Sequence, residues 1–371
     1  MGNNKKSHPG HALPDNQQKQ VKNVTFWGRG FILALGSFVL MALLVPYLVP
    51  GTASTLDIPL AEQKLSILEN NAIQYNVVFL GTSRMYRGID PDVVDAEANT
   101  LGCHIKSYNL GIPGLSTLEQ DYLIDRLGQL QTGINTIIIE PYSVPDRTLD
   151  QFISAQRRYF YDWEHMADVF RDHFSMPNVS GMKVIGRDTL YLIYGFLYEQ
   201  AGVGRLSKLF FPTPEQTEHS HEFKPSSGFQ STDEVLNKSM TKRRKMFLKR
   251  IQLFEDKIKK SGHSTPTRSI INSRYDITAP VISHIYNIKK KPVVLMMPQI
   301  AFVNNARMLE QQLLSMPNKP LTVMNFNKPA QYTDLFNSDN WFDEAHLNKQ
   351  GSIVLSKIVA QHLCATQGQE Q

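Results

Sequence analysis

Short apolar stretches that alternate with helix-like stretches restrict the fold of this chain more than any other feature. The first, Val77 to Leu80, has four apolar residues in succession and ends at Gly81. A continuous apolar run of this length is typical of a strand that is buried on both faces of a sheet. Four more strand-like stretches follow, at residues 105–110, 134–143, 291–300 and 321–326.

Helix signals lie between these stretches. Asp90 followed by Pro91 predicts a helix start, because Asp caps free amides and Pro is tolerated at the first helical position. Ser116 and Glu119 form a capping-box pattern for a helix to about residue 130, and a last helix is expected over 349–364. The alternation predicts an α/β fold in which helices cover both faces of a parallel sheet.

Residues of about 145–290 separate the third and fourth predicted strands and contain no clear strand of their own. We interpret them as a helical insertion that packs on the core, where it would cover a site at the strand ends. A second independent domain is the alternative. With the insertion included, one folded domain is expected over residues 60–366.

The N-terminal region carries a long uncharged stretch. No charged residue occurs from Gly30 to Leu56, and residues 31–49 are long and apolar enough for one membrane-spanning helix. Lysines and an arginine precede this stretch, so the positive-inside rule predicts a cytoplasmic, disordered tail over 1–29. A transmembrane anchor is then expected over 30–50, with the rest of the chain periplasmic or otherwise extracytoplasmic. A cleavable signal peptide is the alternative, because Ala53 and Ser54 are small.

Charge and cysteine content exclude several functional classes. The formal net charge is +5, and two local basic runs, at residues 242–245 and 289–291, are interpreted as solvated faces rather than a nucleic-acid site. Cys103 and Cys364 lack the spacing of metal ligands, so no zinc site or disulfide framework is expected. We expect two buried free thiols, with a disulfide between them as the alternative in an oxidising compartment. No metal and no cofactor are predicted.

Three side chains with catalytic potential follow predicted strands. Ser83 comes directly after the first strand, and Asp343 and His346 lie between the fifth strand and the last helix. The carboxyl ends of parallel strands meet at one edge, so these residues are expected to lie close together. A serine needs a base, and the base needs an orienting carboxylate. Considered alone, a serine directly after a strand is also typical of an ordinary turn without a catalytic role.

An acyl-transfer site would also need donors for the developing oxyanion. The backbone amide of Ser83 is one candidate. The glycine turn after the second strand, residues 109–114 with sequence NLGIPG, supplies another in Gly114 or Gly111.

The order of these motifs resembles that of the SGNH (GDSL-like) hydrolase superfamily, over residues 76–114 and 334–364. The apolar N-terminal stretch, GTSR at 81–84 and DEAHLNKQG at 343–351 look more closely like the membrane-anchored SGNH-like proteins of cell-envelope acylation. These include the alginate and cellulose acetylation proteins and the D-alanine-transfer protein of teichoic-acid modification. The resemblance implies an SGNH-hydrolase-like, flavodoxin-like sheet. It also implies Ser83 as nucleophile, His346 as general base, Asp343 as its orienting partner and Gly114 as an oxyanion donor.

The chain departs from the family pattern in two places. The first block reads Gly-Thr-Ser instead of Gly-Asp-Ser, and the third block reads Glu140-Pro141-Tyr142-Ser143 where the family has an asparagine. That oxyanion donor is therefore missing, or Tyr142 or Ser143 replaces it. Arg84, next to the nucleophile, is a candidate contact for an acidic sugar or an acyl oxygen, the alternative being a surface salt bridge.

The resemblance implies a serine acyltransferase or esterase that acts on an envelope polysaccharide, or another acyl acceptor, through an acyl-serine intermediate. The expected partners are that acceptor, a multi-span membrane O-acyltransferase and the lipid bilayer through one helix. Two alternatives stay open. One is a hydrolase of the lipase or thioesterase type, and the other is a catalytically silent scaffold in an envelope-polymer assembly complex.

Overall fold

The computed structural model describes residues 30–41, 44–45, 47, 60–115, 117–130, 133–141, 155–160, 166–167, 170, 182–200, 223–235, 238–261, 265–317 and 321–367. Its centre is a parallel sheet of five strands in the order β2-β1-β3-β4-β5. The strands are β1 (Val77–Leu80), β2 (Ser107–Asn109), β3 (Thr136–Ile139), β4 (Lys291–Met296) and β5 (Thr322–Asn325). The predicted α/β fold with a parallel sheet is confirmed, and each strand lies inside its predicted stretch.

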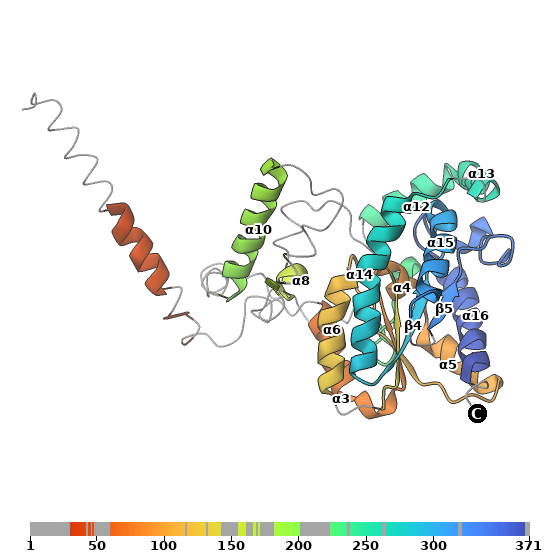
Figure 1. Cartoon of the computed structure of the whole chain (residues 1–371). Coiled ribbons are helices and arrows are strands. Elements are labelled where there is room, and N and C mark those ends of the chain that lie inside the picture. The colour runs from red at the N-terminus through yellow and green to blue at the C-terminus, as the bar shows by residue number, and fades with distance from the viewer. Residues whose placement is uncertain are drawn as a thin grey trace, which may run out of the picture.

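The apolar runs are continuous because both faces of the sheet are covered. Successive side chains of a strand point to opposite faces. Val78 and Leu80 of β1 join one buried cluster, whereas Val77 and Phe79 join the other. Figure 1 shows the two helical layers on opposite sides of the sheet. The first cluster includes residues of α3 (Leu60–Asn70), α6 (Thr117–Gln129), α14 (Arg268–Asn287) and α15 (Val303–Leu314). The second includes residues of α4 (Ser83–Gly88), α5 (Pro91–Thr100) and α16 (Lys349–Gln367).

The strand order predicts where a ligand site lies at the edge of the sheet. The chain runs outward from β1 to β2 and then returns to β3 on the other side of β1. In doubly wound sheets of this order, ligands bind outside the carboxyl ends of the strands, where the direction of winding reverses. The segments that follow β1, β2 and β3 therefore frame the place where a site is expected.

The described residues of the predicted insertion form helices joined by turns and irregular stretches, such as residues 223–231. Its helices are α8 (Ala155–Arg158), α10 (Met182–Gln200), the 3-10 turn η2 (Thr232–Glu234), α12 (Lys238–Leu248) and α13 (Ile251–Lys260). No strand occurs among the described residues between β3 and β4. The last helix of this stretch, α14, packs on the sheet beside α6 and α15, so it belongs to the core layer.

The expected membrane anchor is described only in part. Residues 30–41 form a helix with exposed side chains. Residues 1–29 and several positions of the expected span between 42 and 50 lie outside the described residues. Among the residues that are described, the structure contains no helix that is both long enough and apolar enough to cross a membrane.

The expectation of two free thiols is wrong. Cys103 and Cys364 form a disulfide, with their Cα atoms 5.8 Å apart. The bond forms because α16 packs along α5, which brings the end of the last helix beside the turn that follows α5. This helix pairing joins residues 261 positions apart in the chain, and the spacing of the cysteines contains no signal of it.

Candidate active site

Ser83 stands on a short strand–turn–helix junction. β1 ends at Leu80, and Ser83 is the first residue of α4. Thr82 caps this helix, because its side-chain oxygen accepts a hydrogen bond from the Arg84 amide at 3.2 Å. A Cβ atom on Gly81 would lie 2.8 Å from the Cβ of Glu140 and 2.9 Å from that of Met85. The close approach of β3 and α4 therefore requires glycine just before the turn.

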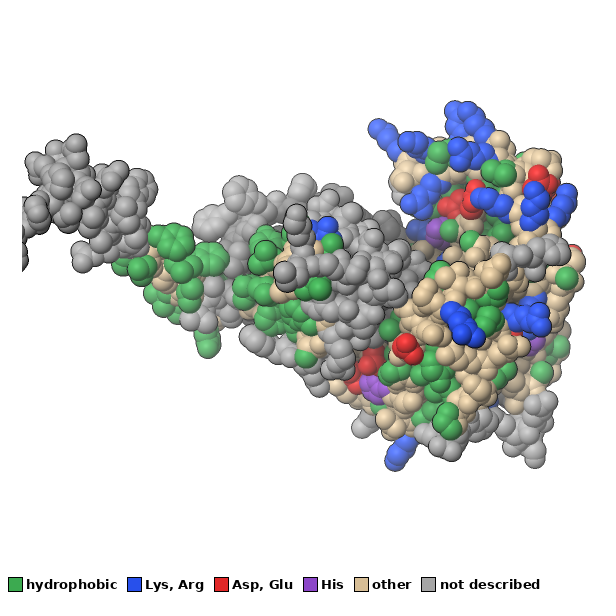
Figure 2. Space-filling view, turned by 45° about the horizontal axis from the view of Figure 1, so that its top comes forward, with side chains coloured by type: hydrophobic (Ala, Val, Ile, Leu, Met, Phe, Trp, Pro, Cys, Tyr) green, Lys and Arg blue, Asp and Glu red, His purple; other side chains and the backbone are tan. Residues whose placement is uncertain are grey.

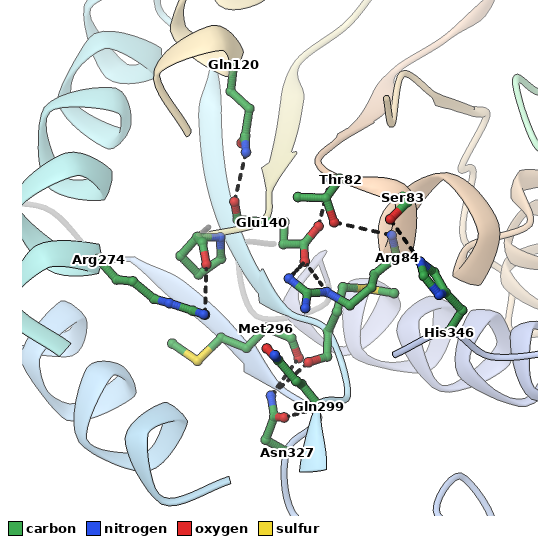
Figure 3. Close-up of polar contacts among 12 residues, drawn as sticks. Thr82, Ser83, Arg84, Gln120, Glu140, Arg274, Met296, Gln299, Asn327 and His346 are labelled. Atoms are coloured by element: carbon green, nitrogen blue, oxygen red, sulfur yellow. Dashed lines mark hydrogen bonds and ion pairs between the residues drawn. The ribbon is translucent and has the colours of Figure 1, made fainter. Parts of the chain in front are cut away.

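The structure brings Ser83, His346 and Asp343 into one hydrogen-bonded chain. Ser83 Oγ lies 2.9 Å from His346 Nε2, and Figure 3 shows the two side chains facing each other. His346 Nδ1 lies 2.9 Å from Asp343 Oδ1 and 3.1 Å from Oδ2. The nucleophile, base and orienting carboxylate of an acyl-transfer site need these distances. Whether the three act catalytically stays a prediction.

A narrow loop holds the histidine and the aspartate together. Trp341 and Leu347 form an antiparallel bridge, and the Phe342 amide donates to the His346 carbonyl at 2.9 Å. Asp343 Oδ1 also accepts from the amides of Ala345 and His346, at 2.8 and 2.9 Å. The aspartate thus fixes both the backbone of its own loop and the imidazole.

The contacts of Asp343 indicate which ring nitrogen of His346 carries a proton. Burial acts to raise the pKa of Asp343, but the hydrogen bonds from His346 and from the loop amides outweigh it, so this pKa lies below its ordinary value of 3.8. A carboxylate only accepts hydrogen bonds, so His346 Nδ1 must carry the proton. In the neutral imidazole Nε2 then carries no proton, and at 2.9 Å it can accept from the Ser83 hydroxyl, as a general base would.

Arg84 forms a buried ion pair rather than the surface salt bridge considered from the sequence. Its Nη2 and Nε atoms lie 2.7 and 2.8 Å from Glu140 Oε1, and the two side chains are 10% and 2% exposed. The other oxygen, Glu140 Oε2, accepts from the Thr82 amide at 2.8 Å. Figure 3 shows that Glu140 contacts both chain neighbours of Ser83. Glu140 stands at the third-block position and was missed, although a charged residue directly after a buried strand was the available signal.

The two glycines of the turn after β2 differ in whether their backbone amides are free to bind an oxyanion. The Gly111 amide donates to Asn109 Oδ1 at 2.8 Å, so the structure does not leave it free for an oxyanion. Gly114 has a φ of +71° and follows Pro113 in a turn closed by Leu115 N–H to Ile112 C=O at 3.1 Å. Within the described part of the chain, the Gly114 amide makes no hydrogen bond. Gly114 is therefore the remaining donor candidate of this turn.

Two further third-block candidates cannot be placed. Tyr142 and Ser143 lie outside the described residues, so their part in the site stays a prediction.

A buried lysine that sequence reasoning missed holds the glycine turn. Lys64, fully buried on α3, donates to the carbonyls of Asn109 and Gly111 at 3.0 and 2.7 Å. Burial, and then the nearby charge of Arg87, lowers the pKa of Lys64 well below its usual 10.5. Its ammonium also lies 3.8 Å from the centre of the Tyr86 ring. Nothing in the local sequence distinguishes Lys64 from a surface lysine.

The described part of the insertion contacts the same turn. Arg157 of α8 donates to the carbonyl of Gly114 and to the carboxylate of Glu119 on α6. This buried arginine therefore connects the insertion to the turn that carries the candidate oxyanion donor.

Comparisons with known proteins add no assignment to this geometry. No protein-family model matches the chain, and no curated protein is significantly similar to it. Among the described residues, no group of His, Cys, Asp and Glu side chains is arranged to hold a metal ion.

Proposed function

We propose that the protein is a serine acyltransferase or esterase of the SGNH-like type that acts on a cell-envelope polysaccharide. The observation that carries the proposal is the hydrogen-bonded chain Ser83–His346–Asp343 at the carboxyl edge of a parallel sheet. An isolated serine hydroxyl is a weak nucleophile near neutral pH, and this arrangement supplies the base and the carboxylate that activate it. The strand order supports the flavodoxin-like arrangement that the sequence resemblance implies.

The reaction has two acyl-transfer steps. Ser83 Oγ attacks the donor carbonyl while His346 Nε2 takes its proton, and Asp343 stabilises the imidazolium. The amides of Ser83 and Gly114 are the candidates to receive the oxyanion. The leaving group takes the proton from His346 as the acyl-Ser83 ester forms. An acceptor hydroxyl then attacks this ester, giving its own proton to His346, and Ser83 recovers a proton as it leaves.

The proposed location is the outer side of the cell membrane, with the chain anchored through residues 30–50. The uncharged N-terminal stretch and its basic flank support this orientation. The Cys103–Cys364 disulfide supports it independently, because disulfides persist in oxidising compartments and are rare in the cytosol. A multi-span membrane O-acyltransferase is the partner proposed to deliver the acyl group.

One observation favours a second candidate, the catalytically silent scaffold. Glu140 occupies the third-block position and is engaged with Arg84 and Thr82, so it supplies no oxyanion donor. Loss of one such donor typically lowers the rate by about a hundredfold or more. The silent scaffold and the slow enzyme are separated by the experiment below.

Ser83→Ala is the test. Fluorophosphonate labelling and hydrolysis of p-nitrophenyl acetate should both be lost, because Oγ is the reacting atom. Ser66→Ala is the matched control. Among the described residues the Ser66 hydroxyl bonds only its own helix, at the Gln63 carbonyl, so its loss should leave both readouts unchanged. Wild-type protein that does not react with the fluorophosphonate, or Ser83→Ala protein that retains its cellular function, would favour the scaffold.

A further inference from the structure

The helices α12 and α13 carry a dense group of exposed cations. Figure 2 shows Lys and Arg side chains gathered over these helices at the top of the view. We name as the basic patch five exposed residues of α12 and the turn after it: Lys242, Arg243, Lys245, Lys249 and Arg250. On α12, Met240 and Phe247 are buried, so the patch occupies the opposite and lateral sides of the helix.

The basic patch is fixed against the loop that carries the triad. The guanidinium of Arg244 donates to the carbonyls of Trp341 and Phe342, at 2.5 and 3.1 Å. Phe254 of α13 packs edge-on against the Trp341 ring, with ring centres 5.2 Å apart. These contacts hold α12 directly beside the residues that precede Asp343.

Two surface hollows connect the basic patch with this loop. One, of about 480 Å³, is lined by Lys245 and Lys249 together with Leu248 and Phe342. The other, of about 270 Å³, is lined by residues that include Arg243, Arg250 and Asp343–Ala345. The cations thus line hollows that both touch the triad loop. Apolar side chains in the first hollow suit the carbon faces of sugar rings.

Nearby carboxylates do not neutralise the patch. Glu344 pairs with Lys257 at 2.6 Å. Asp233 accepts from the Lys349 amide at 2.6 Å, and Glu234 lies 3.5 Å from the Lys349 ammonium. Within the described part of the chain, none of the five patch residues forms an ion pair with a carboxylate. Three cations and one carboxylate, Asp233, line the first hollow, so it carries an excess positive charge that concentrates anions beside the triad loop. In the second hollow Arg243 and Arg250 face Asp343 and Glu344, so the charges of its lining balance.

We propose that the basic patch binds an anionic polysaccharide, one that carries carboxylate or phosphate groups, and presents its hydroxyl to the acyl-serine. This inference rests on the proposed function, because it defines the acceptor of the same site. A polysaccharide fits better than a single-stranded nucleic acid, whose bases require exposed aromatic platforms. The exposed large apolar residues of α12 and α13 are Met246, Leu248 and Leu253, none of them aromatic.

The test compares two charge variants of the full-length chain. The patch variant is Lys242→Gln/Lys245→Gln/Lys249→Gln. The control variant removes the same charge from exposed positions elsewhere and is Lys289→Gln/Arg307→Gln/Lys357→Gln. Binding of oligogalacturonate, an anionic glycan, is measured at low and high salt beside a neutral maltooligosaccharide of equal length.

Wild-type protein should bind the anionic glycan and not the neutral one. The patch variant should bind it about tenfold more weakly, with a smaller salt dependence, and the control variant within about twofold of wild type. Equal binding by the two variants, or equal binding of the two glycans by wild type, would overturn the proposal. So would binding of phosphatidylglycerol vesicles through the same lysines without glycan binding.

Fluorophosphonate labelling separates this proposal from the proposed function. Both variants should label at the wild-type rate, because none of the six residues contacts Ser83 or His346 in the described structure. Glycan binding without labelling would leave the patch assignment standing and reject the enzyme. Labelling without selective binding of the anionic glycan would reject the patch assignment and leave the proposed enzyme standing.

Discussion

Glu140→Gln removes one negative charge from the ion pair behind the nucleophile while keeping the size of the side chain and one acceptor oxygen. Glu140 is 2% exposed and Arg84 is 10% exposed, so the guanidinium would stay buried without the carboxylate that faces it. Breaking a buried pair by removing one partner typically costs about 3–5 kcal/mol. Because the amide oxygen still accepts one hydrogen bond, we expect the free energy of unfolding to fall by about 3 kcal/mol.

A double-mutant cycle isolates the pair. Arg84→Met should cost about 3 kcal/mol as well, because it leaves the Glu140 charge buried. The double variant should cost at least about 2 kcal/mol less than the sum, since it buries neither charge. Urea unfolding followed by circular dichroism measures all four free energies. Glu69→Gln is the control, because the Glu69–Arg126 pair is 27% and 33% exposed and should be worth less than about 1 kcal/mol.

The same variant should impair the nucleophile. Glu140 contacts the residues on both sides of Ser83, so Glu140→Gln should slow fluorophosphonate labelling by about tenfold, an effect of slightly misplaced reacting atoms. Single-variant costs below about 1 kcal/mol that simply add in the double variant would refute the idea that this pair holds the turn.

Two further predictions concern Lys64 and the disulfide. Burial lowers the pKa of Lys64 in the folded chain well below 10.5, its value in the unfolded chain. At pH values between the lowered pKa and 10.5, the unfolded chain therefore binds more protons than the folded chain. Wild-type stability should therefore rise relative to Lys64→Met as pH increases through this window, by up to about 1.4 kcal/mol per pH unit; a pH-independent difference in urea midpoint would contradict this. Cys103→Ser/Cys364→Ser should lower the free energy of unfolding by about 2–4 kcal/mol. Dithiothreitol should reproduce that loss in wild type, and two thiols titrated in unreduced, denatured wild type would show that the bond is absent.

The strands and the placement of the serine follow from local sequence. The run Val77 to Leu80 can bury all its apolar side chains only in a sheet that is covered on both faces. Glycine and a capping threonine then turn the chain into α4. Asp343 and His346 lie three positions apart, so one short loop suffices to join their side chains. These features depend on residues that are close in the chain, and the amino-acid pattern alone determined them.

The remaining features depend on which elements become neighbours. Ser83 and His346 are 263 positions apart, and the strand order, rather than either motif, sets the 2.9 Å between them. The pairing of Arg84 with Glu140 requires β1 to lie beside β3. Glycine is required at position 111 because α4 lies so close that a Cβ there would be 2.6 Å from the Tyr86 amide nitrogen. The disulfide requires α16 to lie along α5. Packing across the whole core selects such contacts. Partners that are far apart in the chain leave no local sequence signal of their contact, so only the tertiary structure decided them.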